Sequence, residues 1–143
     1  MAKTATVQVL GPTKSSASSF ARTVAIGPGI EIQDISRDDI TGDRFDVVPA
    51  RVDLSAKRIV VTLLDSGRFA DVPRSGFNGY AIRFNHLGRN AIAAARVSPM
   101  LDTLGLPSGA VTHTRNTVFV NVDNLPFQSF QGFVIDVSYD TFF

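Results

Sequence analysis

A strict alternation at residues 117–123 restricts the fold of this chain more than any other feature. Val118, Val120 and Val122 fall on one side of an extended backbone, and the intervening residues fall on the other. A period of two with β-branched residues on one face predicts a half-buried β-strand and not a helix. The strand should end near Pro126, because proline lacks the N–H that a continuing ladder needs.

Short alternating runs separated by turn residues occur along most of the chain. Residues 91–97 are ambiguous, because their alanines favour a helix, whereas their position between two strands and Pro99 just after them favour an extended segment. We favour the strand. Other strands are predicted at residues 4–10, 20–26, 30–35, 45–54, 58–64, 76–84, 117–123 and 133–139.

This spacing predicts an all-β fold. About eight or nine short strands at intervals of about 8–15 residues, with no long helical pattern, are typical of a sandwich or closed barrel. We expect a single-domain antiparallel β-sandwich, either immunoglobulin-like or jelly-roll. Residues 52–64 are expected to form a hairpin, and Pro49 should mark an edge or a bulge.

The length and composition of the chain exclude several classes of function. A chain of 143 residues corresponds to one domain, residues 1–143, in which 1–19 form an N-terminal strand or arm and 140–143 an apolar tail. The absence of cysteine excludes disulfides and thiolate chemistry. The net charge is +1 and the basic residues are dispersed, so we expect no nucleic-acid partner. We expect neither a signal peptide nor a membrane span.

A resemblance covers residues 76–127. The matching residues include Phe77-Asn78-Gly79-Tyr80, Arg96-Val97-Ser98-Pro99, Thr103-Leu104-Gly105-Leu106, and the run from Asn116 through Val122 with Leu125 and Phe127. This pattern resembles a β-rich module that accompanies hemolysin-type calcium-binding repeats in large secreted bacterial proteins. The resemblance implies an extracellular adhesive or ligand-binding role. The glycine-aspartate nonapeptides that bind calcium in those proteins are absent from this sequence.

The acidic residues Asp38, Asp39 and Asp43 are the candidate metal ligands, with calcium as the expected ion. Calcium prefers several oxygen ligands, and a loop rich in carboxylates with Gly42 for a tight turn would supply some of them. The alternative is a solvated loop in which Arg37 and Arg44 form local ion pairs. No other cofactor is predicted.

We predict no enzymatic activity. Ser108, His113 and Asp102 are residue types of a catalytic triad, but the segment around Ser108 lacks the G-x-S-x-G nucleophile elbow. For His113, and likewise for His86, we favour an ordinary loop position.

We predict an interface at both ends of the chain. Val7 and Val9 lie in a short N-terminal strand. Phe142 and Phe143 follow the last strand, where an exposed apolar pair would need a partner; the alternative is that this tail folds back over an open edge of the sandwich. The leading hypothesis is therefore a homo-oligomeric structural protein of a virion, such as a phage capsid-decoration or head protein, with itself or a major capsid-type lattice as partner. The alternative is the secreted adhesive or ligand-binding module, stabilised by calcium.

Overall fold

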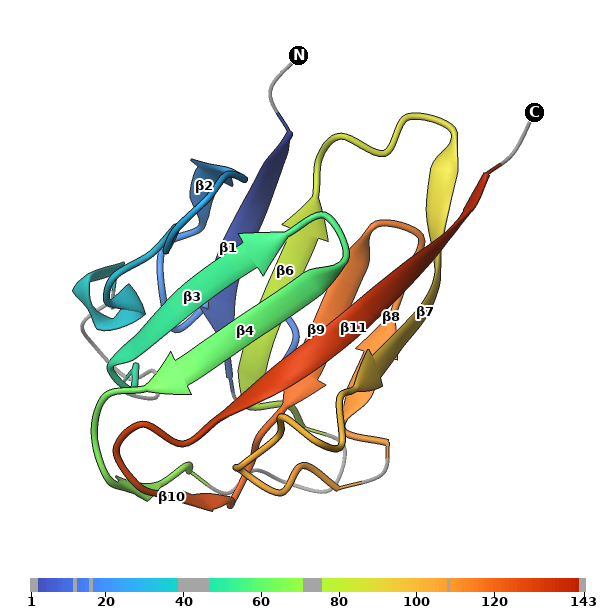
Figure 1. The fold of residues 1–143 in the computed structure, drawn as a ribbon. Coiled ribbons are helices and arrows are strands. Elements are labelled where there is room, and N and C mark those ends of the chain that lie inside the picture. Colours follow the sequence, from blue (N-terminus) through green and yellow to red (C-terminus); the bar gives the residue numbers. More distant parts are fainter. Residues whose placement is uncertain are drawn as a thin grey trace.

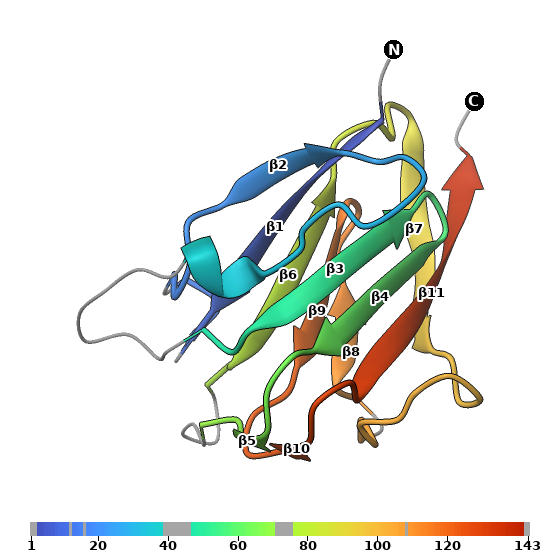
Figure 2. The same cartoon turned by 60° about the vertical axis from the view of Figure 1, so that its left-hand side comes forward.

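The computed structural model describes residues 3–11, 13–15, 17–38, 47–70, 76–107 and 109–141. These residues form two antiparallel sheets packed face to face, with a small third sheet at one end (Figure 1). The described part of the chain is thus an all-β sandwich, as predicted. Figure 2 shows the same layers with the side that carries β2 and the short helix η1 turned toward the viewer.

The first sheet has five strands in the order β2-β1-β6-β9-β8. Its alternating residues behave as the sequence predicts, since Val118 and Val120 are fully buried and Phe119 points to the other face. The strands are β1 (Thr4–Leu10), β2 (Arg22–Ala25), β6 (Gly79–Phe84), β8 (Val111–His113) and β9 (Thr117–Asn121).

The second sheet has four strands in the order β3-β4-β11-β7. The predicted hairpin is confirmed as β3 and β4, joined by a turn at Ala56 and Lys57. β7 confirms the extended interpretation of the alanine-rich segment. The strands are β3 (Ala50–Ser55), β4 (Arg58–Leu63), β7 (Asn90–Val97) and β11 (Gly132–Thr141).

The core fills the space between these two sheets. Tyr80 of the first sheet meets Phe133 of the second with ring centroids 5.6 Å apart, and both side chains are almost completely buried. At one end of the sandwich, β5 (Gly67–Arg68) pairs with β10 (Pro126–Phe127), and this pair brings the Phe69 and Phe127 rings to 4.6 Å. The chain enters β1 and leaves β11 at the opposite end.

The prediction of a strand at residues 30–35 is wrong. Ile32 forms one isolated bridge with Val52, and the chain then turns into the 3-10 helix η1 (Ile35–Asp38). The Asp34 carboxylate explains the change, because its Oδ1 accepts hydrogen bonds from the Ser36 N–H and hydroxyl at 2.9 and 2.7 Å. A short acidic side chain that bonds the backbone ahead of it favours a helical turn over continued extension.

Candidate binding site on the five-stranded sheet

The outer face of the five-stranded sheet carries an aromatic side chain, Phe119, in a row with smaller ones. The strand register places Gln8, Ala81, Phe119 and Thr112 side by side across β1, β6, β9 and β8. Opposed residues in such rows point to the same face of a sheet. Phe119 therefore stands between the small side chains Ala81 and Thr112, so the surface falls away on both sides of its ring.

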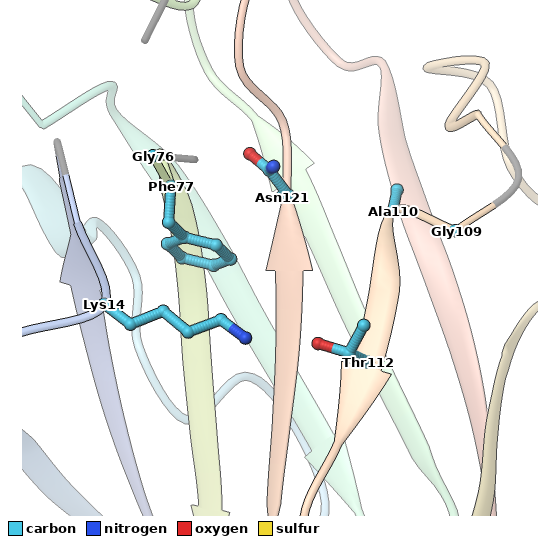
Figure 3. A pocket seen from close by; sticks show the side chains of 7 residues that line it. All are labelled: Lys14, Gly76, Phe77, Gly109, Ala110, Thr112 and Asn121. Carbon is cyan, nitrogen blue, oxygen red and sulfur yellow. The ribbon is translucent and has the colours of Figure 1, made fainter. Parts of the chain in front are cut away.

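Lys14 lies over this aromatic ring. Its Nζ is 4.5 Å from the Phe119 ring centroid and 5.6 Å from that of Phe77, and the two rings meet edge to face at 6.0 Å. Figure 3 shows the Lys14 side chain reaching across the sheet toward Thr112, with the Phe77 ring beside it. An exposed cation–π contact of this kind contributes about 0.5–1 kcal/mol, enough to orient the ammonium group.

Two buried serines hold the chain that returns from the Lys14 turn. Ser18 and Ser19 are fully buried, and both donate their N–H to the Val9 carbonyl. The Ser19 hydroxyl in turn accepts the Val9 N–H at 2.9 Å, and Gln8 donates its side-chain amide to the Ser19 carbonyl. These bonds attach the segment after Lys14 to β1, and so fix one side of the Lys14 turn beside the sheet.

Two hollows flank Lys14 on this face. The first, of about 330 Å³, is lined by Lys14, Gly76, Phe77, Gly109, Ala110, Thr112 and Asn121. The second, of about 250 Å³, is lined by Lys14, Thr6, Gln8, Leu10, Ala21, Ala81, Arg83, Thr117 and Phe119. Lys14 and Arg83 are the charged residues among the described residues that line these hollows, and none of the described lining residues is acidic. The described lining of both hollows therefore carries positive charge together with hydroxyl and amide groups.

The predicted N-terminal interface is not supported by the position of its residues. Val7 and Val9 are 0% and 7% exposed, because β1 lies inside the sheet between β2 and β6 and turns both side chains into the sandwich core. Their side chains pack within the domain and are not available to a neighbour. Phe142 and Phe143 lie outside the described residues, so the interface predicted for them stays a prediction.

The calcium site also stays a prediction. Asp39 and Asp43 lie outside the described residues, and Asp38 is the last residue of η1. Within the part of the chain that the structure describes, no three acidic or histidine residues come together in a group that could hold a metal ion.

The candidate triad residues have separate structural roles where they are described. The Asp102 carboxylate accepts the N–H groups of Leu104, Gly105 and Leu106, which shapes the loop after β7. His113 is exposed at the end of β8, with its Nδ1 3.1 Å from the carbonyl of Thr114. Ser108 lies outside the described residues, and the expected absence of enzymatic activity remains a prediction.

The sequence patterns do not mark Lys14, Phe77 or Phe119 as binding residues. One signal was present, because Phe119 is a large aromatic residue on the outward side of a strand whose other outward residues are polar. The aromatic residue differs from the polar residues on either side of it on this face, Thr117 and Asn121. The position of Lys14 had no local signal, since it depends on the fold of a loop far away in the sequence.

Comparisons with known proteins give no match: no family model, curated protein or solved structure is similar to this chain. The resemblance to the hemolysin-associated module thus stays an expectation. Among the described residues, no helix has the length and apolar character needed to cross a bilayer.

Proposed function

We propose that this protein is a non-enzymatic interaction domain that binds a negatively charged, extended segment of a partner protein on the outer face of its five-stranded sheet. The observation that carries the proposal is the Lys14 ammonium group held over Phe119 between two hollows, neither of which has an acidic residue among its described lining residues. The binding groups are provided by β1, β6, β8 and β9 and by the Lys14 turn.

The Lys14 ammonium group has hydrogen-bonding capacity that a ligand could use. A lysine ammonium has three donors and no acceptor, and an aromatic ring satisfies it only weakly. Among the described residues, no carboxylate forms an ion pair with Lys14; the ion pair seen there joins Arg58 to Asp136 on the other sheet. A carboxylate of a partner would therefore add a charge-assisted hydrogen bond without displacing an internal one.

The shape of the face favours a protein segment over a sugar or a nucleic acid. Lys14 lies over the Phe77 and Phe119 rings, which leaves less aromatic surface for stacking a sugar or a base. The two cations among the described lining residues, Lys14 and Arg83, also fall short of the basic stripe that a phosphate backbone requires. Hydroxyl and amide side chains around an apolar centre suit a polar peptide that carries a few acidic residues.

The first setting proposed for this interaction is assembly in a virion, as a capsid-decoration or head protein that docks on a capsid-type lattice. Exposed apolar side chains favour a protein partner: Met100 and Phe130 are 92% and 70% exposed, on loops that adjoin β7 and β11. Phe130 also has a positive φ of 71°, a strained backbone for an aromatic residue, and such strain concentrates at functional positions.

The second candidate is the secreted adhesive or ligand-binding module. The observation that favours it is that most of the site comes from the segment with the resemblance. Residues 76–127 provide Phe77, Thr112, Phe119 and Asn121. The binding mode proposed for the sheet face is the same in both settings.

The test uses poly-L-glutamate as the acidic probe. Backbone amide shifts of the ¹⁵N-labelled protein are followed by NMR during titration at low salt and again at about 0.5 M salt, where exposed charges are screened within about 5 Å. The expected result is a set of shifts at Ala81, Thr112, Phe119 and Asn121 that shrinks at high salt. Polygalacturonate and a single-stranded oligonucleotide serve as competing anions of other classes.

Charge-reversal variants locate the binding. Lys14→Glu and Arg83→Glu are expected to weaken glutamate binding at least tenfold each, whereas Lys57→Glu, in the β3–β4 turn, should leave it unchanged. Equal weakening by all three variants would show that binding depends on net charge alone, and it would refute the proposed location of the binding site. Stronger binding of polygalacturonate or of the oligonucleotide on the same face would refute the assignment to a peptide.

A further inference from the structure

β7 is the longest edge strand of the two main sheets. It has eight residues, against six in β3, four in β2 and three in β8, and it contains neither proline nor lysine. Its protection is limited to the charge of Arg96 and to an irregularity in its pairing with β11 next to Ala94. The other edge of its own sheet, β3, is covered, because Val52 exchanges backbone hydrogen bonds with Ile32 and the Glu31 side chain accepts the Leu54 N–H.

The hydrogen-bond pattern shows which groups of β7 face outward. Ser98, just after the strand, donates its N–H to the Val134 carbonyl of β11 at 2.8 Å. Residues in an antiparallel pair alternate between bonding their neighbour and pointing away from it. The N–H and C=O groups of Val97 and Ala95 therefore point away from β11. Near the start of β7, the edge is closed by the Ile92 N–H, which donates to the Arg115 carbonyl at 2.8 Å.

A hollow of about 300 Å³ lies beside this open half of the edge. Its lining residues are Ala95, Arg96, Val97, Leu106, Pro107, Gly109 and Val111. Ala95, Val97, Leu106 and Val111 are partly buried and pack against the core, so the hollow exposes the apolar border of the sandwich between β7 and β8. An extended segment placed here would pair with β7 and cover this border.

We propose that a second copy of this chain occupies the hollow, with the two β7 strands paired antiparallel across a twofold axis at Ala95. A twofold interface must be self-complementary, and β7 meets this requirement in the proposed register. The axis opposes Ala95 to Ala95 of the partner subunit and Arg96 to Ala94 of the partner subunit. Small side chains thus face each other, and the like charges of the two arginines are not opposed. The two four-stranded sheets become one sheet of about eight strands, a size that open sheets reach.

This dimer goes beyond the proposed binding function, because its paired strand is β7 of the four-stranded sheet, whereas Lys14 lies over the five-stranded one. The two sites approach each other at β8, since Gly109 lines both the hollow beside β7 and the first hollow beside Lys14. Ala95 lines neither Lys14 hollow, so the Ala95→Pro variant should lose dimerisation and keep poly-L-glutamate binding, whereas Lys14→Glu should do the reverse.

The test is the solution mass of the full chain over a range of concentrations, measured by sedimentation velocity. Wild type is expected to form a dimer that dissociates on dilution. Ala95→Pro removes one outward N–H and should give a monomer at all concentrations, since proline is tolerated where the N–H of an edge strand is not used within the sheet. Ala25→Pro is the matched control. The Ile26 N–H donates to the Lys3 carbonyl, so by the same alternation the Ala25 N–H points out of the free edge of β2, and this variant should remain dimeric.

Amide hydrogen exchange provides a second measurement that needs no variant. The Ala95 and Val97 amides of wild type should become protected as concentration rises, whereas the Ala25 amide should not. A wild type that stays monomeric at millimolar concentration would overturn the proposal. A folded Ala95→Pro variant that still dimerises would overturn it as well.

Discussion

Gly132 is a position at which one methyl group should destabilise the whole fold. It is the first residue of β11 and pairs with Thr62 of β4. A Cβ added there would lie 1.9 Å from the carbonyl oxygen of Val61 and 3.0 Å from its carbonyl carbon, whereas ordinary contacts begin at 3.4 Å. Because the obstacle is backbone in a paired strand, no side chain can rotate to make room. We predict that Gly132→Ala forces β11 away from β4.

The magnitude follows from the bonds around this residue. The Gly132 carbonyl accepts the N–H groups of Thr103 and Leu104 at 3.0 Å each, and its own N–H donates to the Thr103 hydroxyl. Overpacking costs about 1–3 kcal/mol. Each hydrogen bond lost adds about 0.5–1.5 kcal/mol. We expect a loss of about 3 kcal/mol in the free energy of unfolding, or roughly 10 °C in Tm.

The assay is urea unfolding followed by far-UV circular dichroism. Gly27→Ala is the matched control, since nothing lies within 4 Å of a Cβ added there. That variant should stay within about 0.5 kcal/mol of wild type. A loss below about 1 kcal/mol in Gly132→Ala, at an unchanged dependence on urea, would refute the predicted clash and with it the close β4–β11 approach.

Three further predictions concern the core and its ionisable groups. Burial, and then the negative charge of Glu31 and its hydrogen bond, raise the pKa of Asp53. The folded state therefore favours the protonated form, and stability should fall as pH rises from the ordinary aspartate pKa of about 3.9 through the raised value. Asp53→Asn should reduce the change of the urea midpoint with pH between pH 3.5 and 7. An unchanged slope would contradict the raised pKa of Asp53. Ile135→Ala, at a fully buried position, should cost about 2–5 kcal/mol, whereas Ile30→Ala, at a 40% exposed position, should cost under about 1 kcal/mol in the same assay. Burial raises the pKa of Tyr139 to about 12, so its ultraviolet titration should show no phenolate below about pH 11, and Tyr139→Phe should lower stability by about 1 kcal/mol because its hydroxyl donates to a carbonyl in the β3–β4 turn.

Local pattern predicted most of the strands and failed where side chains act on their own backbone. The alternation at residues 117–123 was sufficient to place Val118 and Val120 in the core. Residues 30–35 have the composition of a strand, but the Asp34 carboxylate initiates the 3-10 helix. The strands β5, β8 and β10 have two or three residues each, too few to show a periodicity. Their formation depends on what lies beside them.

The amino-acid sequence by itself determined the all-β class, the hairpin of β3 and β4, and the inward or outward direction of side chains along the longer strands. These properties follow from a two-residue period and from turn residues, which act over short distances in the chain. The tertiary structure alone decided that β1 pairs with both β2 and β6, which buries Val7 and Val9 in the core. It also brought Lys14 over Phe77 and Phe119, and it placed a hollow beside the outer edge of β7 at Ala95 and Val97. Strand order and loop position arise from contacts between segments far apart in the sequence, and a local pattern contains no information about which segments those are.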